Sequence, residues 1–524
     1  MEQRGWYYQL CIAGVVIFLV VLFYGASLNI PFAHHDAMRY FGKHFLPQDI
    51  VDPNDPYFEA DWSLGRPLAA ITGNFIFHRV EDFAGLAFVR AISVGMAALF
   101  GCGVAYILLR TTAFASTAVL LGVLAAVLPG FQDRVVMPMP YYVLGAWGAL
   151  GAALFWNASI GMPWRMLWTA GCLIFAMLCY PVAAFLFVPL LSIHLFWPPA
   201  GKEPYPARHV MYGVGLLFFC SAVYLFLAKA VLLPRFPAAL ASTFHAYNLQ
   251  PSLPGMASKL PYLFCEGAAY FLNPFSPYGG IGAAYLVLLV ALVAMTLDQS
   301  LVRSKRFIRM LLWLFLLLAS VFVWAVSPMR ILLYRALYPG MLLNTITLAW
   351  ATGSVLRGLG IRRRLAGLGV AGFLALLIIC SQTRLQLNVW NYNSELMFLR
   401  ASLAPASIHP VDRIHVIGPV ADGYGFNGQP VIDDVNNMNS SAFAFELEFM
   451  VKMGLWGQVP NRPLWYCRAT QPECVEQQPA GVLLLTSSRL GEAVTASPNM
   501  LTVDFNDLRR ATQVFRGAGI REKY

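Results

Sequence analysis

Long apolar runs recur along the whole chain and limit its fold more than any other feature. A helix needs about 20 apolar residues to cross the hydrocarbon core of a membrane. Only 12% of the 524 residues are charged, whereas a soluble domain carries about 25% charged residues. The sequence therefore predicts an α-helical polytopic membrane protein with about 11 transmembrane helices. The expected spans lie near 7–28, 84–109, 112–129, 139–157, 164–180, 181–197, 210–233, 279–297, 309–327, 336–355 and 365–384.

Basic loops between these runs orient the chain in the membrane. The segments "RSKRFIR" (303–309) and "RGLGIRRR" (357–364) each lie between two apolar runs, and short basic loops stay on the cytoplasmic side. The net charge of +10 thus reflects topology, and no nucleic acid is expected as a partner. The first run is too long for a signal peptide and is expected to remain as a helix. The N-terminus is then cytoplasmic, and an odd number of spans places the C-terminus outside.

The topology depends on a break inside the apolar stretch 164–197. Pro181 offers that break, because proline interrupts a helix. If 164–197 were instead one tilted helix, every later segment would change sides and the basic loops would face outward. The break is therefore the preferred interpretation.

Two domains are expected. Residues 1–385 form the membrane domain, with long extracytoplasmic loops at 30–83 and 234–278, and residues 386–524 form a small extracytoplasmic α/β domain after a linker. Strand-like runs occur at 413–419, 481–487 and 501–505, and a helical pattern occurs at 442–456. Cys467 and Cys474 lie close together in this tail, and an oxidising compartment favours a disulfide between them. A zinc site would need four ligands, and no nearby side chains complete one.

The stretch "IPFAHHDAMRYF" (30–41) follows the first span and carries the first candidate site. If it is helical, Asp36 and Arg39 are three residues apart and share a face. The carboxylate of Asp36 could accept a proton from an acceptor hydroxyl, or the pair could be an ion pair that fixes the loop. His34, His35 and Asp36 are metal-ligand types, but adjacent helical residues point about 100° apart. No cofactor is therefore expected, and a divalent metal is a disfavoured alternative.

Extracytoplasmic arginines supply the second candidate site. In "DWSLGRPL" (61–68), which begins with Asp61, Arg66 offers a two-pronged donor at a helix start, and such a position suits a phosphate. Arg134, Arg330 and Arg335 also lie outside despite the positive-inside rule. Charges kept at the membrane against that rule are functional candidates, although snorkelling arginines are a common alternative.

These motifs resemble a known family. An acidic residue followed by Arg at the third position after it, then "GRPL" (65–68) in the same loop, and the stretch "CYPVAAFLF" (179–187) that starts with Tyr180 resemble the bacterial serotype-converting O-antigen glucosyltransferases of phages. That family belongs to the wider C-type glycosyltransferase (GT-C) fold. Two positions depart from its pattern: His35 replaces the first of two acidic residues, and Pro181 stands where glutamine is usual.

The resemblance implies a transferase in the bacterial inner membrane. A sugar would pass from a polyprenyl-phosphate donor to a cell-surface glycan, glycolipid or pilin-like acceptor at the periplasmic face. Asp36 would be the general base beside Arg39, and Arg66, Arg330 and Arg335 would bind the donor phosphate. Membrane lipid, a donor flippase and a donor synthase are the other expected partners. A transporter or flippase, or an O-antigen polymerase or ligase, are the alternatives.

Overall fold

The computed structural model describes eleven stretches and a few isolated positions of the chain. These are residues 6–30, 66–80, 83–136, 140–199, 207–232, 303–323, 334–408, 411–418, 464–468, 483–489 and 499–508, with positions 254, 255, 257, 258 and 294. The chain divides into two compact units. The membrane unit comprises residues 1–25, 57–75 and 90–384, and the sheet unit comprises residues 26–56, 76–89 and 385–524.

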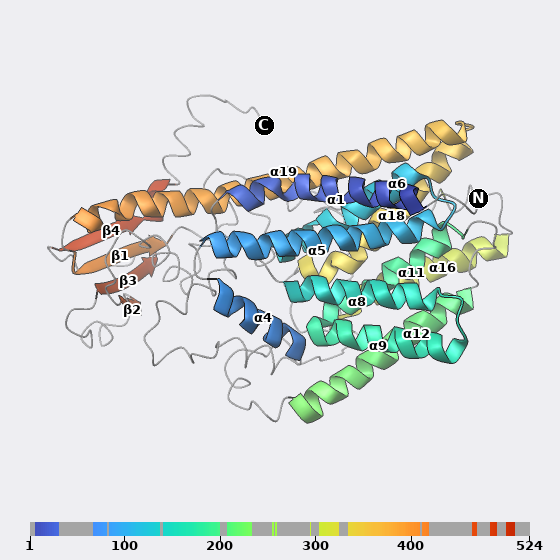
Figure 1. Ribbon diagram of the computed structural model, residues 1–524, viewed down its shortest axis with the longest axis horizontal. Coiled ribbons are helices and arrows are strands. Elements are labelled where there is room, and N and C mark those ends of the chain that lie inside the picture. The colour runs from blue at the N-terminus through green and yellow to red at the C-terminus, as the bar shows by residue number, and fades with distance from the viewer. Residues whose placement is uncertain are drawn as a thin grey trace. The chain divides into compact units, whose positions relative to one another are not determined.

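Helices make up the described part of the membrane unit (Figure 1). Helix α8 packs along α9, α9 contacts α12, and α18 contacts α7, α11 and α16. Within the described residues, the helices are α1 (Trp6–Asn29), α4 (Pro67–Arg79), α5 (Phe83–Leu109), α6 (Ala115–Val127), α7 (Pro129–Val136), α8 (Pro140–Trp156), α9 (Met162–Cys179), α10 (Pro181–Ala184), α11 (Phe187–Phe196), α12 (Ala207–Leu227), the π-helix η2 (Ala228–Leu232), α16 (Arg303–Ser320), α18 (Tyr334–Gly358) and α19 (Arg363–Ile408).

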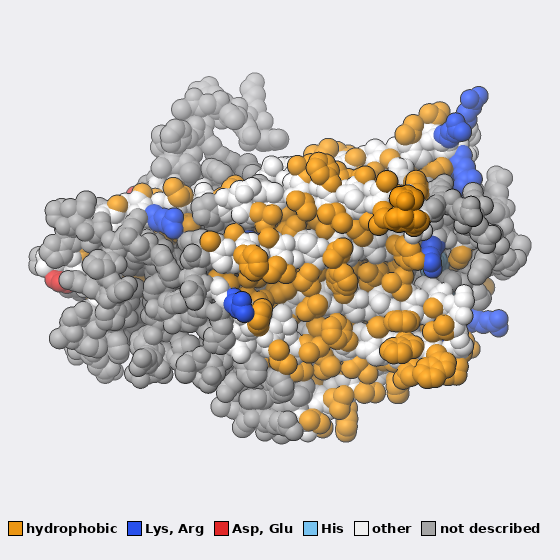
Figure 2. All heavy atoms as spheres, viewed as in Figure 1, with side chains coloured by type: hydrophobic (Ala, Val, Ile, Leu, Met, Phe, Trp, Pro, Cys, Tyr) orange, Lys and Arg blue, Asp and Glu red, His pale blue; other side chains and the backbone are white. Residues whose placement is uncertain are grey.

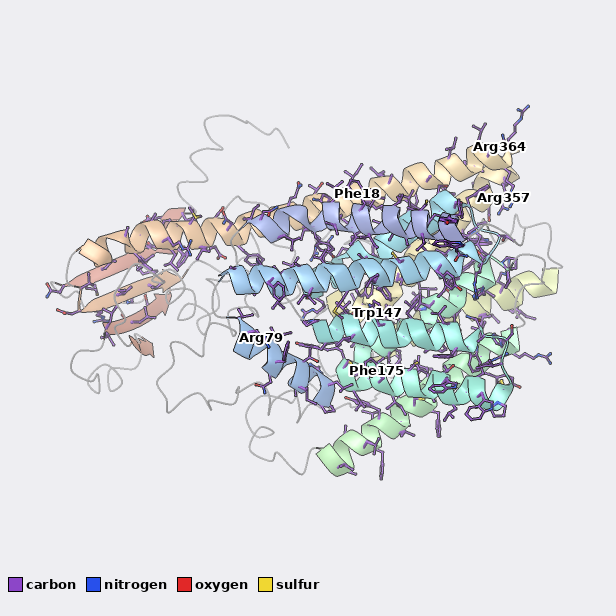
Figure 3. The ribbon with its side chains drawn as sticks, viewed as in Figure 1. Phe18, Arg79, Trp147, Phe175, Arg357 and Arg364 are labelled. Carbon is purple, nitrogen blue, oxygen red and sulfur yellow. The ribbon has the colours of Figure 1, made fainter. Side chains whose placement is uncertain are left out.

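The outward faces of these helices are apolar, as Figure 2 shows. Phe18 on α1, Trp147 on α8 and Phe175 on α9 lie on such faces (Figure 3), and Phe18 is 65% exposed. A soluble monomer rarely exposes an apolar surface this large. Five described helices are long and apolar enough to cross a membrane, or six if the bent pair α6–α7 is one span. The protein is therefore a multi-pass helical membrane protein.

The expected number of 11 spans is not reached within the described residues. The segment 279–297 lies outside them apart from position 294. The apolar helices at Pro181–Phe196 and Phe307–Ser320 are shorter than 18 residues, and α8 has 17 residues. Short helices of this kind need partners or a thinner bilayer to span the hydrocarbon.

Two proline breaks divide the apolar runs. The expected break before Pro181 is present, because Tyr180 has an extended backbone (φ −160°, ψ 111°) between α9 and α10. The second break was not expected, since 112–129 reads as one span. Leu128 is extended there (ψ 148°), Pro129 begins α7, and the axes of α6 and α7 differ by 53°.

Close glycine contacts join α5 and α6. A Cβ atom built on Gly122 would lie 2.6 Å from the backbone oxygen of Gly101, and one built on Gly101 would lie 2.6 Å from the oxygen of Gly122. Real Cβ atoms do not approach backbone oxygens that closely. Small residues at this crossing therefore let the two backbones meet, as is common between membrane helices.

Helix α19 continues where a linker was expected. It runs for 46 residues without interruption, because the sequence has no glycine or proline from residue 373 to residue 404. After residue 384 its buried apolar side chains alternate at spacings of four and three residues, which is the periodicity of one buried helix face. These side chains are Leu385, Val389, Tyr392, Leu396, Leu399 and Leu403.

The sheet unit contains a four-stranded parallel sheet. Its strands are β1 (Arg413–Gly418), β2 (Leu464–Arg468), β3 (Leu483–Arg489) and β4 (Met500–Asp504), in the order β2-β3-β1-β4. Strands β1, β3 and β4 overlap the three predicted runs, with β3 displaced by two residues, whereas β2 was not predicted. Cys467 lies on β2 in register with Thr486. The predicted disulfide lies outside the described residues, since neither the side chain of Cys467 nor Cys474 is described.

Candidate functional site

The break between α6 and α7 leaves backbone carbonyls without their usual helical donors. In a continuous helix, the carbonyl of residue i accepts from the N–H of residue i+4. Pro129 has no N–H, and the extended Leu128 turns the next N–H groups away from the carbonyls of residues 125–127. An unsatisfied backbone group costs several kcal/mol in a membrane, so these three carbonyls need other donors.

Side chains from three helices provide those donors. Each donor is a hydroxyl or an amide that is buried in the membrane unit. The Tyr338 hydroxyl donates to the carbonyl of Ala125, the Tyr24 hydroxyl donates to that of Ala126 at 2.8 Å, and Gln132 Nε2 donates to that of Val127 at 2.7 Å. All three carbonyls at the break thus accept a hydrogen bond from a side chain.

Buried arginines surround the same break. Arg384 on α19 donates from Nη1 to Gln132 Oε1 at 2.9 Å. Arg90 on α5 donates from Nε to the carbonyl of Val136, the last residue of α7, at 2.9 Å. Arg134 lies on α7 itself and is fully buried. Three guanidinium groups therefore belong to α7 or bond to it.

Arg66 and Tyr180 meet in the membrane unit. The guanidinium carbon of Arg66 lies 4.3 Å from the centre of the Tyr180 ring, which is within the range of a cation–π interaction. Arg66 is 7% exposed and immediately precedes α4, where its carbonyl accepts from the N–H of Ala70 at 2.9 Å. The Tyr180 ring is available for this contact because its residue lies at the break between α9 and α10.

A chain of aromatic rings links Arg66 to the broken helix. The Tyr180 ring lies 5.0 Å from that of Tyr142, which in turn lies 5.9 Å from Phe131. Phe131 on α7 lies 5.2 Å from Tyr338. We refer to Arg66, Arg90, Arg134, Arg384 and the tyrosines in contact with them or with α6–α7 as the arginine–tyrosine cluster.

The cluster lies far along its helices from the basic loops. Tyr338 is near the start of α18, whereas Arg357 is near its end. Arg384 is 21 residues after Arg363, the first residue of α19, and this separation corresponds to about 30 Å at 1.5 Å per residue. Figure 3 shows Arg357 and Arg364 together at the other end of these helices. The two basic features are therefore separated by about the thickness of the hydrocarbon core.

The structure brings some of the predicted residues together. Arg66 and Tyr180 are in contact, and Arg134 lies three residues after Phe131 on α7. The backbone of Arg335 lies in the first turn of α18, three residues before Tyr338, but its side chain is outside the described part. Asp36, Arg39, His35, Asp61 and Arg330 all lie outside the described residues.

Sequence reasoning missed other members of the cluster. Arg90 and Arg384 were counted as parts of a span or its edge, and Gln132 and Tyr338 were not singled out. An arginine inside or beside an apolar run is itself a signal, because such charges are costly and usually functional. Within the described residues no group of three His, Cys, Asp or Glu side chains could hold a metal ion. That the protein works without a cofactor stays a prediction.

Comparisons with known proteins give a distant structural likeness. No protein-family model matches the chain, and no curated protein matches it in sequence. Among solved structures, it is similar to the archaeal oligosaccharyltransferase AglB from Archaeoglobus fulgidus, which was solved in complex with an inhibitory peptide and a dolichol-phosphate. The identity is 13% and the TM-score 0.38, over 86% of this chain and 69% of that chain. A likeness at this score carries no functional argument by itself.

Proposed function

We propose that this protein is a membrane-embedded glycosyltransferase that moves a sugar from a polyprenyl-phosphate donor to a cell-surface glycan or glycolipid. The observation that carries the proposal is the arginine–tyrosine cluster, above all the contact of Arg66 with Tyr180 at 4.3 Å. Two short motifs that are 114 residues apart in the sequence contribute to one buried site. Both belong to the resemblance on which the transferase hypothesis was based.

The chemistry of the donor fits such a cluster. A polyprenyl phosphate places an anion at the membrane boundary while its chain stays among lipid-facing helices. Arginine is suited to bind it, because the planar guanidinium offers paired N–H donors to phosphate oxygens. The contact with the Tyr180 ring at 4.3 Å restricts the Arg66 guanidinium, so that less rotamer entropy is lost when the phosphate binds.

The proposed reaction follows from this placement. The acceptor hydroxyl attacks the anomeric carbon of the sugar, and the bond between that carbon and the phosphate oxygen breaks. Asp36 takes the hydroxyl proton as general base, which is typically worth a factor of about 10²–10⁴ in rate. Arginines, including Arg66, Arg330 and Arg335, stabilise the negative charge of the leaving lipid phosphate. Residues 1–385 carry this chemistry, and the domain at 386–524 helps to hold the acceptor.

The orientation of the site supports a lipid-linked donor. The basic loops belong on the cytoplasmic side by the positive-inside rule, and the cluster lies at the start of α18 and 21 residues into α19, far from those loops. The site would then face the periplasm of a bacterial inner-membrane protein. Nucleotide sugars are absent there, so an activated sugar has to arrive on a lipid.

The broken helix favours a second candidate, a transporter of the same lipid-linked sugar. Discontinuous membrane helices, such as the bent pair α6–α7, commonly form the binding sites of transporters. In that case the arginines would guide the phosphate across the membrane and no bond would be broken. The two candidates share a substrate and differ in whether a new glycoside is formed.

Transfer and transport can be measured on the same purified protein. The substrates are polyprenyl-phosphate hexoses, beginning with glucose, and rates are normalised to folded protein. We expect Asp36→Asn to remove transfer while donor binding persists, and Arg66→Ala to weaken both binding and rate. Arg110→Ala is the matched control, since Arg110 stacks on Tyr106 at 4.5 Å at the basic end of α5.

Two outcomes would contradict the proposal. Donor movement between the leaflets of a reconstituted vesicle, without transfer to any acceptor, would identify a transporter. Transfer by Asp36→Asn within a few-fold of wild type would exclude Asp36 as the general base. If Arg66→Ala and Arg110→Ala changed donor binding and transfer equally, the arginine–tyrosine cluster would not be the donor site.

A further inference from the structure

A pocket at the basic end of the membrane unit is separate from the arginine–tyrosine cluster. It has a volume of about 400 Å³ and lies between the end of α18, the start of α19, and residues of α6, α11 and α16. Arg309, Arg357 and Arg363 line it, together with apolar walls that include Phe114, Trp350 and Val370. The proposed glycosyl transfer does not use this pocket.

Three helices deliver the three arginines to the pocket. Arg309 on α16 is 9% exposed, lies 5.9 Å from the centre of the Trp350 ring and donates from Nη2 to the carbonyl of Leu195 at 3.1 Å. Arg363 begins α19, with its guanidinium 5.4 Å from the centre of the Phe114 ring. These contacts hold the two guanidinium groups in place before any ligand arrives.

The third arginine is held by its own helix. Arg357 Nε donates to the carbonyl of Gly353 at 3.0 Å, and its Nη2 donates to Ser354 Oγ at 3.2 Å. Both partners lie within one turn of Arg357 on α18. These bonds hold the Arg357 guanidinium against its own helix, where it lines the pocket. Three positioned cations therefore share one pocket.

The charge of the lining selects the class of ligand. The described lining residues include three arginines and no aspartate or glutamate. Guanidinium groups from several helices around one cavity favour an anion with several oxygens, for which phosphate is the best match. The aromatic and aliphatic walls provide contact area for the carbon atoms next to such a phosphate.

Exposed leucines beside the pocket favour a lipid over a soluble phosphate. Leu365 is 57% exposed and Leu368 is 67% exposed, and both lie in the first two turns of α19 beside Ala366, which lines the pocket. Acyl chains can cover these side chains, whereas free phosphate cannot. Basic pockets between membrane helices on the cytoplasmic side are suited to anionic headgroups.

We propose that this pocket binds the phosphate headgroup of an anionic membrane lipid in the cytoplasmic leaflet. The bound phosphate would join the end of α18 to the start of α19 through Arg357 and Arg363. The ligand would then stabilise the membrane unit at the end that lies opposite the proposed reaction site.

Two double variants in the same loop separate the pocket from general surface charge. Arg357→Gln with Arg363→Gln removes two lining cations, and Arg362→Gln with Arg364→Gln removes two cations that do not line the pocket. Both pairs change the net charge equally. All four arginines are exposed, so both variants are expected to fold.

The full-length protein in detergent micelles that contain phosphatidylcholine is titrated with phosphatidylglycerol. Native mass spectrometry counts the bound lipid, and thermal unfolding is followed on the same samples. We expect wild type and the Arg362/Arg364 variant to bind phosphatidylglycerol and to unfold at a higher temperature. The Arg357/Arg363 variant should bind about ten-fold more weakly or worse, because charge-assisted hydrogen bonds are lost.

Each other result would overturn the proposal. Equal loss of binding in the two double variants would mean that only surface charge attracts the lipid. Equal stabilisation by inorganic phosphate and by phosphatidylglycerol would reject a lipid as the ligand. Binding of phosphatidylglycerol that is unchanged in the Arg357/Arg363 variant would place the lipid elsewhere.

Discussion

Replacing Tyr338 by phenylalanine tests whether side chains hold the break between α6 and α7. The change removes one hydroxyl from a side chain that is fully buried and donates to the carbonyl of Ala125. The ring and its contact with Phe131 at 5.2 Å remain. Because Pro129 has no N–H, the backbone offers no replacement donor at the usual helical position. The carbonyl of Ala125 should therefore lose its described cap.

The expected cost can be bounded from two kinds of measurement. Leaving a buried acceptor without a donor costs about 1–3 kcal/mol in proteins generally. Hydrogen bonds between membrane helices average about 0.6 kcal/mol and reach about 1.7 kcal/mol, since the unfolded chain in the bilayer also finds partners. A carbonyl four residues before a proline has fewer such partners, so a value of about 1.5 kcal/mol is expected for Tyr338→Phe.

Reversible unfolding in mixed detergent micelles measures this cost. Tyr24→Phe, which uncaps the carbonyl of Ala126, should behave like Tyr338→Phe. Tyr212→Phe is the matched control, because Tyr212 is 62% exposed on α12 and its change should stay within about 0.5 kcal/mol. If both buried variants unfold like the control, the hydroxyls do not hold the break and the capping argument is wrong.

Other predictions concern packing, redox state and topology. Gly122→Ala should destabilise the membrane unit by about 1–3 kcal/mol, because the new Cβ would lie 2.6 Å from the oxygen of Gly101; Gly215→Ala, with nothing within 4 Å, should be neutral or stabilising under the same thermal unfolding assay. Alkylation of unreduced, denatured protein should leave Cys467 and Cys474 unlabelled, and labelling of both would exclude the disulfide. A reporter fused after residue 524 should be active in the periplasm, and a cytoplasmic signal would refute the predicted orientation.

A proline in the sequence was enough to predict one helix break, but a second proline of the same kind was overlooked. Pro181 was read correctly because the stretch 164–197 is too long for one ordinary span. Pro129 has the same chemistry, but it stands at the end of a run of ordinary length, so the break looked like the end of the span. The length of the apolar run therefore decided whether a break was predicted, although the proline alone was sufficient reason to predict one. The polar residues Gln132 and Arg134, which follow that break, were the signal that the chain continues inside the protein.

The candidate site could be predicted only in its separate parts. Arg66 and Tyr180 were identified from short motifs, but their contact at 4.3 Å joins positions 114 residues apart in the sequence, and no local pattern reveals such a contact. The caps from Tyr24 and Tyr338 were invisible for the same reason, since tyrosines near helix ends usually mark the membrane interface. Strand β2 was missed because "LWYCR" (464–468) is short and was considered only for its cysteine, although its Trp and Tyr favour a strand.

The hydrogen bonds of the broken helix also depend on the order in which the ribosome makes the chain. Tyr24 is made before α6, but Tyr338 follows its partner carbonyl by 213 residues, and Gln132 gains the carbonyl of Ser381 only 249 residues later. At about 5–20 residues per second, the ribosome needs on the order of 10–40 s to supply Tyr338. During that delay α6 and α7 would carry an exposed polar backbone into lipid. We therefore expect the pair to stay beside the insertion machinery, or in a wet pocket of the nascent protein, until Tyr338 supplies the last donor to these carbonyls.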